Sequence, residues 1–249
     1  ARYLLSSAVM NNQIYVIGGL KSSFDACPDV ELYDPFFDKW TKKANMKTAR
    51  LGFGTAVVKG RIYAIGGKTN STGPPVSVVE EYDPTNDSWI PKTDMPTARW
   101  NFAVAVIRSK IYCIGGRNGD DILSIIEEYN PENDVWIRKA DMPEPRAGFS
   151  ASMVNGKIYI IGGGNADGAL LANEAYDPDI EMWTKKAEMI TERSHVSTSS
   201  FNGKNYATGG VNSNQGFLPV VEEYDTGLVG QSIDVKNKLT TNWGKIKKQ

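Results

Sequence analysis

The stretch that decides the fold runs from Met95 to Gly116 and reads MPTARWNFAVAVIRSKIYCIGG. It holds two short apolar segments, 102–107 and 111–114, which are separated by the polar residues Arg108, Ser109 and Lys110. Two such segments around a tight polar turn are typical of a β-hairpin. The closing Gly-Gly predicts a point where the backbone needs positive φ or approaches another segment closely.

The features of this stretch recur along the whole chain. Gly-Gly pairs begin at residues 18, 66, 115, 162 and 209, at intervals of 48, 49, 47 and 47. Each pair follows a tyrosine by three residues and an arginine by 16, and these arginines are Arg2, Arg50, Arg99, Arg146 and Arg193. A second tyrosine follows each pair, and in the first four copies a tryptophan stands seven residues further on. One register kept over five copies predicts a repeat architecture.

Each repeat is predicted to hold four strands. After the hairpin and a variable loop comes a third segment such as 78–82, then Asp-Pro, which favours a turn. A fourth, more polar segment begins at the tryptophan, as in 136–139. Four antiparallel strands in each repeat of this length form a β-propeller blade. We therefore expect an all-β fold.

At this point the chain resembles the Kelch-repeat family, on its Gly-Gly pairs, Tyr-Asp-Pro, the spaced tryptophan and the Met-Pro-x-x-Arg segments at 95–99 and 142–146. The resemblance covers almost the whole chain and implies one propeller domain, 1–249. Its blades are expected at approximately 1–48, 49–97, 98–144, 145–191 and 192–249. Kelch propellers usually have six blades, so the alternatives are a five-bladed ring, which we favour, and a six-bladed one with sequence missing.

The fifth repeat departs from the pattern. Thr226 replaces the proline after Tyr224-Asp225, and Trp243 follows Tyr224 by 19 residues rather than seven. Residues 243–247 still resemble the earlier outer segments, so we predict that they form the fifth blade's outer strand.

Composition excludes several function classes. Lys and Arg total 28 against 29 Asp and Glu, a net charge of −1 that gives no footprint for nucleic acid or an anionic membrane. The hydrophobic fraction of 41% is typical of a soluble protein, and no apolar run is long enough to span a bilayer. We expect no membrane insertion and see no targeting segment, and the compartment stays open.

One histidine and two cysteines limit the chemistry further. Sites with several histidine ligands and disulfide frameworks cannot be built, which also excludes the copper oxidase chemistry known on propellers that resemble Kelch. We expect no metal and no cofactor. Cys113 is predicted to lie in the core, and Cys27 to be a free thiol in a loop.

Residues present in every repeat are predicted to hold the blades together. The tyrosine and tryptophan markers should pack between blades. The arginines should hydrogen-bond nearby backbone, with a cationic ring for an anionic ligand as the alternative. The acid pairs Glu80-Glu81, Glu127-Glu128 and Glu222-Glu223 are predicted to be structural or solvated, because neighbours in a strand point to opposite faces.

Function is therefore expected where the repeats differ. In Kelch adapter domains that resemble this chain, the positions just after each arginine and each Gly-Gly contact a bound peptide. Carried over, the candidate binding residues are Tyr3, Leu51, Trp100, Asn101, Ser194, His195, Lys68, Arg117 and Asn118. Trp100 beside Arg117 is the clearest non-structural feature, because both types are enriched at binding hot spots. The alternative is that Trp100 and Tyr3 only plug the channel.

We expect a non-catalytic scaffold that binds a protein or peptide at the loop-bearing mouth of the propeller, and a monomer. A carbohydrate-binding or carbohydrate-modifying site is the first alternative, since a sugar mutarotase is known among Kelch-like propellers. Trp100 and Tyr3 would then stack on a sugar ring. The second alternative is a purely structural repeat unit.

Overall fold

The structure is a computed structural model, and it describes residues 1–21, 25–227 and 243–245. Every regular element in these residues is a β-strand, which confirms the predicted all-β class. Within the same residues no helix is long and apolar enough to cross a membrane. The chain forms two compact units, 1–139 and 140–249, which are described separately.

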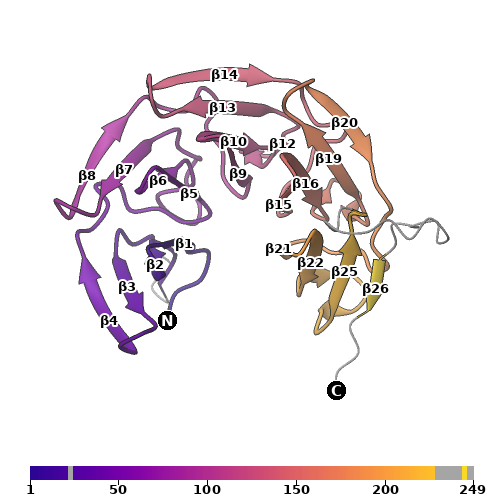
Figure 1. Cartoon of the computed structure of the whole chain (residues 1–249), viewed down its shortest axis with the longest axis horizontal. Coiled ribbons are helices and arrows are strands. Elements are labelled where there is room, and N and C mark those ends of the chain that lie inside the picture. Colours follow the sequence, from indigo (N-terminus) through magenta and orange to yellow (C-terminus); the bar gives the residue numbers. More distant parts are fainter. Residues whose placement is uncertain (22–24, 228–242, 246–249) are drawn as a thin grey trace. The chain divides into compact units, whose positions relative to one another are not determined.

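The first unit contains three four-stranded antiparallel blades (Figure 1). The first consists of β1 (Ser6–Met10), β2 (Gln13–Ile17), β3 (Val30–Asp34) and β4 (Lys39–Lys43). The second consists of β5 (Gly54–Val58), β6 (Arg61–Ile65), β7 (Val79–Asp83) and β8 (Ser88–Lys92). The third consists of β9 (Ala103–Ile107), β10 (Lys110–Ile114), β13 (Ile126–Asn130) and β14 (Val135–Lys139). The innermost strand β5 contacts both β1 and β9, so the three blades are consecutive neighbours.

The second unit contains two more blades. One consists of β15 (Ser150–Val154), β16 (Lys157–Ile161), β19 (Asn173–Asp177) and β20 (Met182–Lys185). The other consists of β21 (Ser197–Phe201), β22 (Lys204–Thr208), β25 (Val221–Asp225) and β26 (Trp243–Lys245). The pairing of Tyr224 with Trp243 repeats that of Tyr33 with Trp40, so the predicted outer strand is confirmed over 243–245. Residues 246–247 of that prediction lie outside the described residues. The five blades confirm the predicted β-propeller fold.

Short two-stranded ribbons extend from three of the Gly-Gly pairs, where the sequence predicted only variable loops. They are β11 (Arg117–Asn118) with β12 (Asp121–Ile122), β17 (Gly164–Asn165) with β18 (Gly168–Ala169), and β23 (Val211–Asn212) with β24 (Gly216–Phe217). The ribbons give backbone order to residues directly beside the predicted site.

The core lies within each blade and between neighbouring blades. In β10 the side chains of Ile111, Cys113 and Ile114 are fully buried, as expected for a second strand covered on both faces, and this confirms Cys113 as a core residue. Cys27 is a free thiol, but it too is buried. Between the second and third blades, Val58 and Ile65 share one cluster with Ile111 and Tyr129. Each blade therefore buries an apolar face that it could not cover alone.

The Gly-Gly pairs mark the close approach of neighbouring blades. Gly66 and Gly67 have φ values of 62° and 93°, and the Gly67 N–H donates to the Arg99 carbonyl at 2.8 Å. A Cβ atom at Gly66 would lie 2.8 Å from that same carbonyl oxygen. Positive φ and lack of space both require glycine here, as the sequence predicted.

In the second and third blades, the tryptophan marker bonds to the blade before it. Trp89 Nε1 donates to the Ala44 carbonyl at 2.9 Å, and the Ala44 N–H donates to Asp87 Oδ1 at 3.0 Å. Asp87 also accepts the Tyr82 hydroxyl at 2.6 Å. The next blade repeats the set with Trp136, Thr93 and Asp134, at 2.9 Å and 3.0 Å for the first two bonds. These contacts confirm inter-blade packing for the aromatic markers of the second and third blades, whereas Trp40 of the first blade is 56% exposed.

Candidate binding surface

The repeated arginines form ion pairs inside the blades. Arg99 is fully buried; its Nη2 lies 2.5 Å from Glu127 Oε2, and its Nη1 donates to the carbonyls of Gly115 and Ile125. Burial lowers the pKa of the Arg99 guanidinium, and the charge of Glu127 opposes that shift. The equivalent pairs are Arg2–Glu31, Arg50–Glu80, Arg146–Glu174 and Arg193–Glu222. The predicted backbone bonds are present for Arg2, Arg50, Arg99 and Arg193, whereas Nε and Nη1 of the buried Arg146 have no hydrogen-bond partner among the described residues. Because these guanidinium groups are buried against glutamates, they do not form a cationic ring open to a ligand.

The glutamate partners are a marker that the sequence analysis missed. A glutamate stands two residues before the second tyrosine in every repeat, as Glu80 does before Tyr82. Glu80 is buried against Arg50, whereas its neighbour Glu81 points to the other face and accepts the Tyr63 hydroxyl at 3.0 Å. The constant spacing of glutamate, tyrosine and arginine could have revealed the ion pair.

Apart from Leu51, which is buried, the predicted binding residues of the first unit lie on one surface, which we call the loop face. It is formed by the residues just after each arginine and each Gly-Gly pair. Within a blade these two positions are bonded to each other: Trp100 N–H donates to the Arg117 carbonyl at 3.0 Å, and Arg117 N–H returns a bond of 2.9 Å. Leu51 and Lys68 form the same reciprocal pair, and so do Tyr3 and Leu20. The backbone therefore holds each predicted pair side by side.

A chain of backbone bonds links the three blades at this surface. The Gly52 N–H donates to the Leu4 carbonyl at 2.9 Å, and the Asn101 N–H donates to the Gly52 carbonyl at 2.8 Å. All three residues have positive φ, between 53° and 58°. A Cβ atom at Gly52 would lie 3.0 Å from Trp100 Cε3, so the indole rests directly on the preceding blade.

The indole of Trp100 also meets a cation from that blade. Lys68 Nζ lies 4.8 Å from the centre of the Trp100 ring and donates to the Ser71 carbonyl at 3.2 Å. A cation over an indole face within this distance is attracted by the ring electrons. The structure thus brings Lys68, Trp100 and Arg117 together from two neighbouring blades.

The remaining predicted residues of the first unit differ in exposure. Tyr3 is 48% exposed, and Asn118 at the ribbon β11 is exposed, whereas Leu51 is only 2% exposed. Asn101 lies half-buried in the backbone chain between blades. Leu51 therefore lies beneath the surface that Tyr3, Trp100 and Lys68 present.

Ser194 and His195 belong to the second unit. Ser194 forms the same reciprocal backbone pair with Val211, at 2.9 Å and 2.8 Å. His195 is exposed, has a φ of 53° and donates its N–H to the Gly148 carbonyl. Its Nδ1 lies 3.3 Å from Ser194 Oγ. His195 thus occupies the position in its blade that Asn101 occupies in the third.

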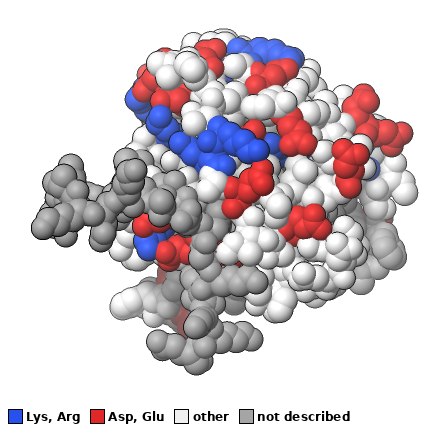
Figure 2. Space-filling view, turned by 90° about the vertical axis from the view of Figure 1, so that its right-hand side faces the viewer, with Lys and Arg blue, Asp and Glu red and all other residues white. Residues whose placement is uncertain are grey.

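The surface charges are mixed. Figure 2 shows basic and acidic side chains gathered in small adjoining patches on the face that it draws, in keeping with a net charge of −1. The described residues contain no group of three histidine, cysteine or acidic side chains placed to hold a metal ion.

Comparison with known proteins finds matches to single stretches of Kelch proteins. The chain is 43% identical over 63 residues to Kelch-like protein 15 of Danio rerio, which is 23% of this chain and 10% of that protein. It is 42% identical over 67 residues to human Kelch repeat and BTB domain-containing protein 12, at 23% and 11% coverage. An F-box/kelch-repeat protein of Arabidopsis thaliana is 36% identical over 72 residues, at 29% and 19% coverage. The matched region spans between about a tenth and a fifth of these relatives.

Two comparisons extend over most of the chain. The solved structure of YjhT superposes with a TM-score of 0.80 over 90% of this chain and 82% of that one, at 17% identity, which is a likeness of fold. The profile of the KLHDC2/KLHL20/DRC7 Kelch-repeats domain matches residues 5–210. The chain therefore belongs to this Kelch-repeat family.

Proposed function

We propose that the chain is a non-catalytic binding scaffold whose loop face in the first unit contacts a peptide segment of a protein partner. The observation that carries this proposal is the cluster of Lys68, Trp100 and Arg117. These side chains are partly exposed, they come from two blades, and no other blade repeats them.

Setting aside the residues that have structural partners supports this assignment. In the second and third blades, the repeated arginine and glutamate pair with each other and the repeated tryptophan bonds to the preceding blade, so these residues have little left to offer a ligand. The loop-face residues differ from blade to blade, as expected of positions that specify a partner rather than a fold.

The chemistry of the cluster suits protein recognition. The Trp100 indole is fixed by Gly52 below it and by Lys68 beside it, so it would lose little conformational entropy on binding. Arg117 supplies N–H donors in a fixed planar fork for carbonyl or carboxylate groups. Tryptophan and arginine are among the side chains most enriched at interface hot spots.

The relatives fit the same role. Two of them are named for a BTB domain or an F-box in addition to their Kelch repeats. A repeat domain joined to a second domain of another kind is the arrangement expected when the repeats recognise a partner and the other domain acts on it.

The test is capture of binding proteins from the source cells on immobilised wild-type chain. The test variant is Trp100→Ala/Arg117→Ala. The matched control is Phe36→Ala/Phe37→Ala, which removes side chains that are 88% and 72% exposed at the β3–β4 turn. All three proteins must first show equal melting temperatures.

We expect a protein that the wild type and the control retain and the test variant loses. Undiminished capture by the test variant would remove the site from the loop face. Glycan binding that depends on Trp100, with no protein captured, would replace this proposal with the carbohydrate alternative.

A further inference from the structure

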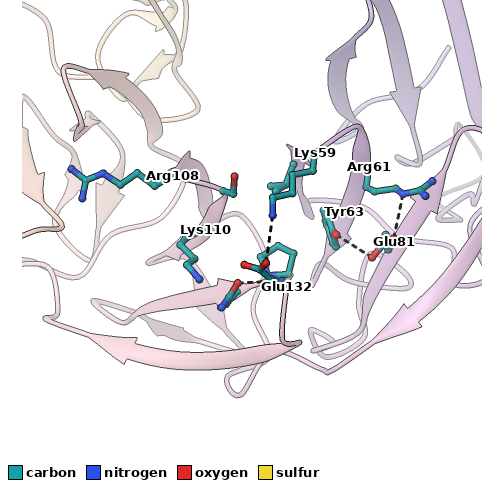
Figure 3. Close-up of a pocket in the computed structure, with 11 residues that line it drawn as sticks. Lys59, Arg61, Tyr63, Glu81, Arg108, Lys110 and Glu132 are labelled. Carbon is teal, nitrogen blue, oxygen red and sulfur yellow. Dashed lines mark hydrogen bonds and ion pairs between the residues drawn. The ribbon is translucent and has the colours of Figure 1, made fainter.

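A second surface of the first unit carries a cavity that the loop face does not explain. It lies at the opposite ends of the strands, where the turns between first and second strands and between third and fourth strands emerge. The cavity has a volume of about 400 Å³ and lies between the second and third blades (Figure 3). Its lining includes Lys59, Lys110 and Glu132 at the turns, with Tyr63 and Glu81 behind them.

Comparison of the repeats shows what is unusual here. In the other four blades, the first residue of the second strand forms a hydrogen bond or an ion pair with a carboxylate at the end of the third strand. The pairs are Gln13–Asp34 at 2.7 Å, Arg61–Asp83, Lys157–Asp177 at 3.0 Å and Lys204–Asp225 at 3.9 Å. In the third blade the equivalent residues are Lys110 and Asn130, so the carboxylate is replaced by an amide.

The amide does not compensate for that loss. Asn130 Oδ1 accepts the backbone N–H of Glu132 at 3.1 Å. Across the described part of the chain, Lys110 has no ion pair. The third blade therefore presents an ammonium group whose usual partner is missing, and that group lies in the wall of the cavity.

A second lysine reaches the same space from the second blade. Lys59 Nζ lies 3.9 Å from Glu132 Oε1, and the two side chains are 64% and 75% exposed. An ion pair this exposed and this long is weak and open to exchange. Figure 3 shows Lys59 and Lys110 on either side of Glu132, while Arg108 extends away from them.

The back of the cavity is already neutralised. Glu81 accepts the Tyr63 hydroxyl at 3.0 Å and lies near Lys92 at 3.6 Å and Arg61 at 3.7 Å. Burial, followed by the charge of Glu81, raises the pKa of Tyr63, so its hydroxyl remains a donor. The unbalanced positive charge thus lies at the entrance, with Lys59 and Lys110.

We propose that this cavity is a second binding site, separate from the loop face, which takes the carboxylate groups of an acidic peptide segment. An incoming carboxylate gives Lys110 the partner that its counterparts have within their own blades, and it competes with Glu132 for Lys59. The volume lies in the range of ligand pockets of about 300–1,000 Å³ and exceeds what one small ion fills, which favours a peptide.

The test is fluorescence anisotropy of a fluorescein-labelled hexaglutamate peptide at low ionic strength, with wild-type protein and three variants. Asn130→Asp restores the carboxylate found in the other blades, so it should fold normally. Lys110→Gln removes the cation. Lys157→Gln removes the equivalent cation from the fourth blade and is the matched control. We expect Asn130→Asp and Lys110→Gln each to raise the Kd about fivefold or more, with no change for Lys157→Gln.

Three results would overturn the proposal. One is an unchanged Kd in Asn130→Asp. Another is equal weakening by Lys157→Gln, which would show only general charge attraction. The third is binding of inorganic phosphate at Lys110 without binding of hexaglutamate. The Trp100→Ala/Arg117→Ala protein should bind hexaglutamate like the wild type, which separates this site from the loop face.

Discussion

Arg99 and Glu127 show how single residues commit the repeat to one structure. Both are almost fully buried, and Glu127 also accepts the Thr97 hydroxyl at 2.7 Å. A charge taken out of water needs a partner, so removal of either residue leaves the other in an unfavourable environment. The pair therefore fixes the loop before the first strand against the third strand.

Glu127→Gln tests this pair with little change in shape. We expect it to lower the free energy of unfolding by about 3 kcal/mol, because it strands a buried guanidinium. Urea unfolding followed by tryptophan fluorescence measures the loss. Glu132→Gln, at a side chain that is 75% exposed, is the control and should change stability little. Equal effects of both substitutions would contradict the account.

Gly52 and Gly60 form a second matched test at the residue scale. Both have positive φ, of 58° and 73°, but a Cβ atom at Gly52 meets Trp100 whereas one at Gly60 meets nothing within 4 Å. Both alanine variants should lose about 1 kcal/mol of stability from the strained backbone. Only Gly52→Ala should also move Trp100 and lower the affinity for the captured partner. Anisotropy with that partner checks this, and a similar loss in Gly60→Ala would disprove the positioning of Trp100.

At the scale of elements, the hydrogen bond from the tryptophan of an outer strand to the preceding blade holds neighbouring blades of the first unit together. Trp89 is 4% exposed and donates to the Ala44 carbonyl, whereas Trp40 in the first blade is 56% exposed. Trp89→Phe should therefore cost about 1 kcal/mol from the lost hydrogen bond, plus the packing of the missing ring. Trp40→Phe should cost less. The melting temperatures of both variants test this expectation. A larger decrease for Trp40→Phe than for Trp89→Phe would contradict the role given to the Trp89–Ala44 hydrogen bond.

Elements were more predictable from sequence than the contacts between them. The Gly-Gly spacing predicted five blades, and the likeness of residues 243–247 to the earlier outer segments predicted the outer strand of the last one, because hairpins and turns are local. The Arg–Glu pairs depend on strands that are distant in sequence, and only their spacing hinted at them. The contact of Lys68 with Trp100 joins two blades and leaves no periodic signal at all.

At the scale of the whole molecule, the shared hydrogen bonds set a pH range of stability. Burial raises the pKa of Tyr82, and its hydrogen bond to Asp87 adds to that shift above 10.0. Burial would also raise the pKa of Asp87, but the bonds from Tyr82 and Ala44 outweigh it and hold that pKa below 3.8. In the same way, the pKa of Tyr129 is raised and the pKa of Asp134 is lowered.

The directions of these pKa shifts determine how stability should depend on pH. Raised tyrosine pKa values contribute stability that is present below pH 10.0 and lost as the pH rises through the folded values. Lowered aspartate pKa values contribute stability that is present above pH 3.8 and lost as the pH falls through the folded values. Urea unfolding across the pH scale should therefore show a plateau with a decline at each end. Tyr82→Phe should make the free energy of unfolding fall less steeply at alkaline pH. An unchanged alkaline decline would contradict the contribution assigned to the Tyr82 hydroxyl.

The central claim, that the loop face of the first unit contacts the partner, is tested most directly by site-specific photo-crosslinking. Benzoylphenylalanine is placed at Tyr3, which is 48% exposed on the loop face, and in a separate protein at Phe37, which is 72% exposed at the β3–β4 turn. The account predicts that the captured partner crosslinks from position 3 and not from position 37. Crosslinking from position 37 alone would contradict it.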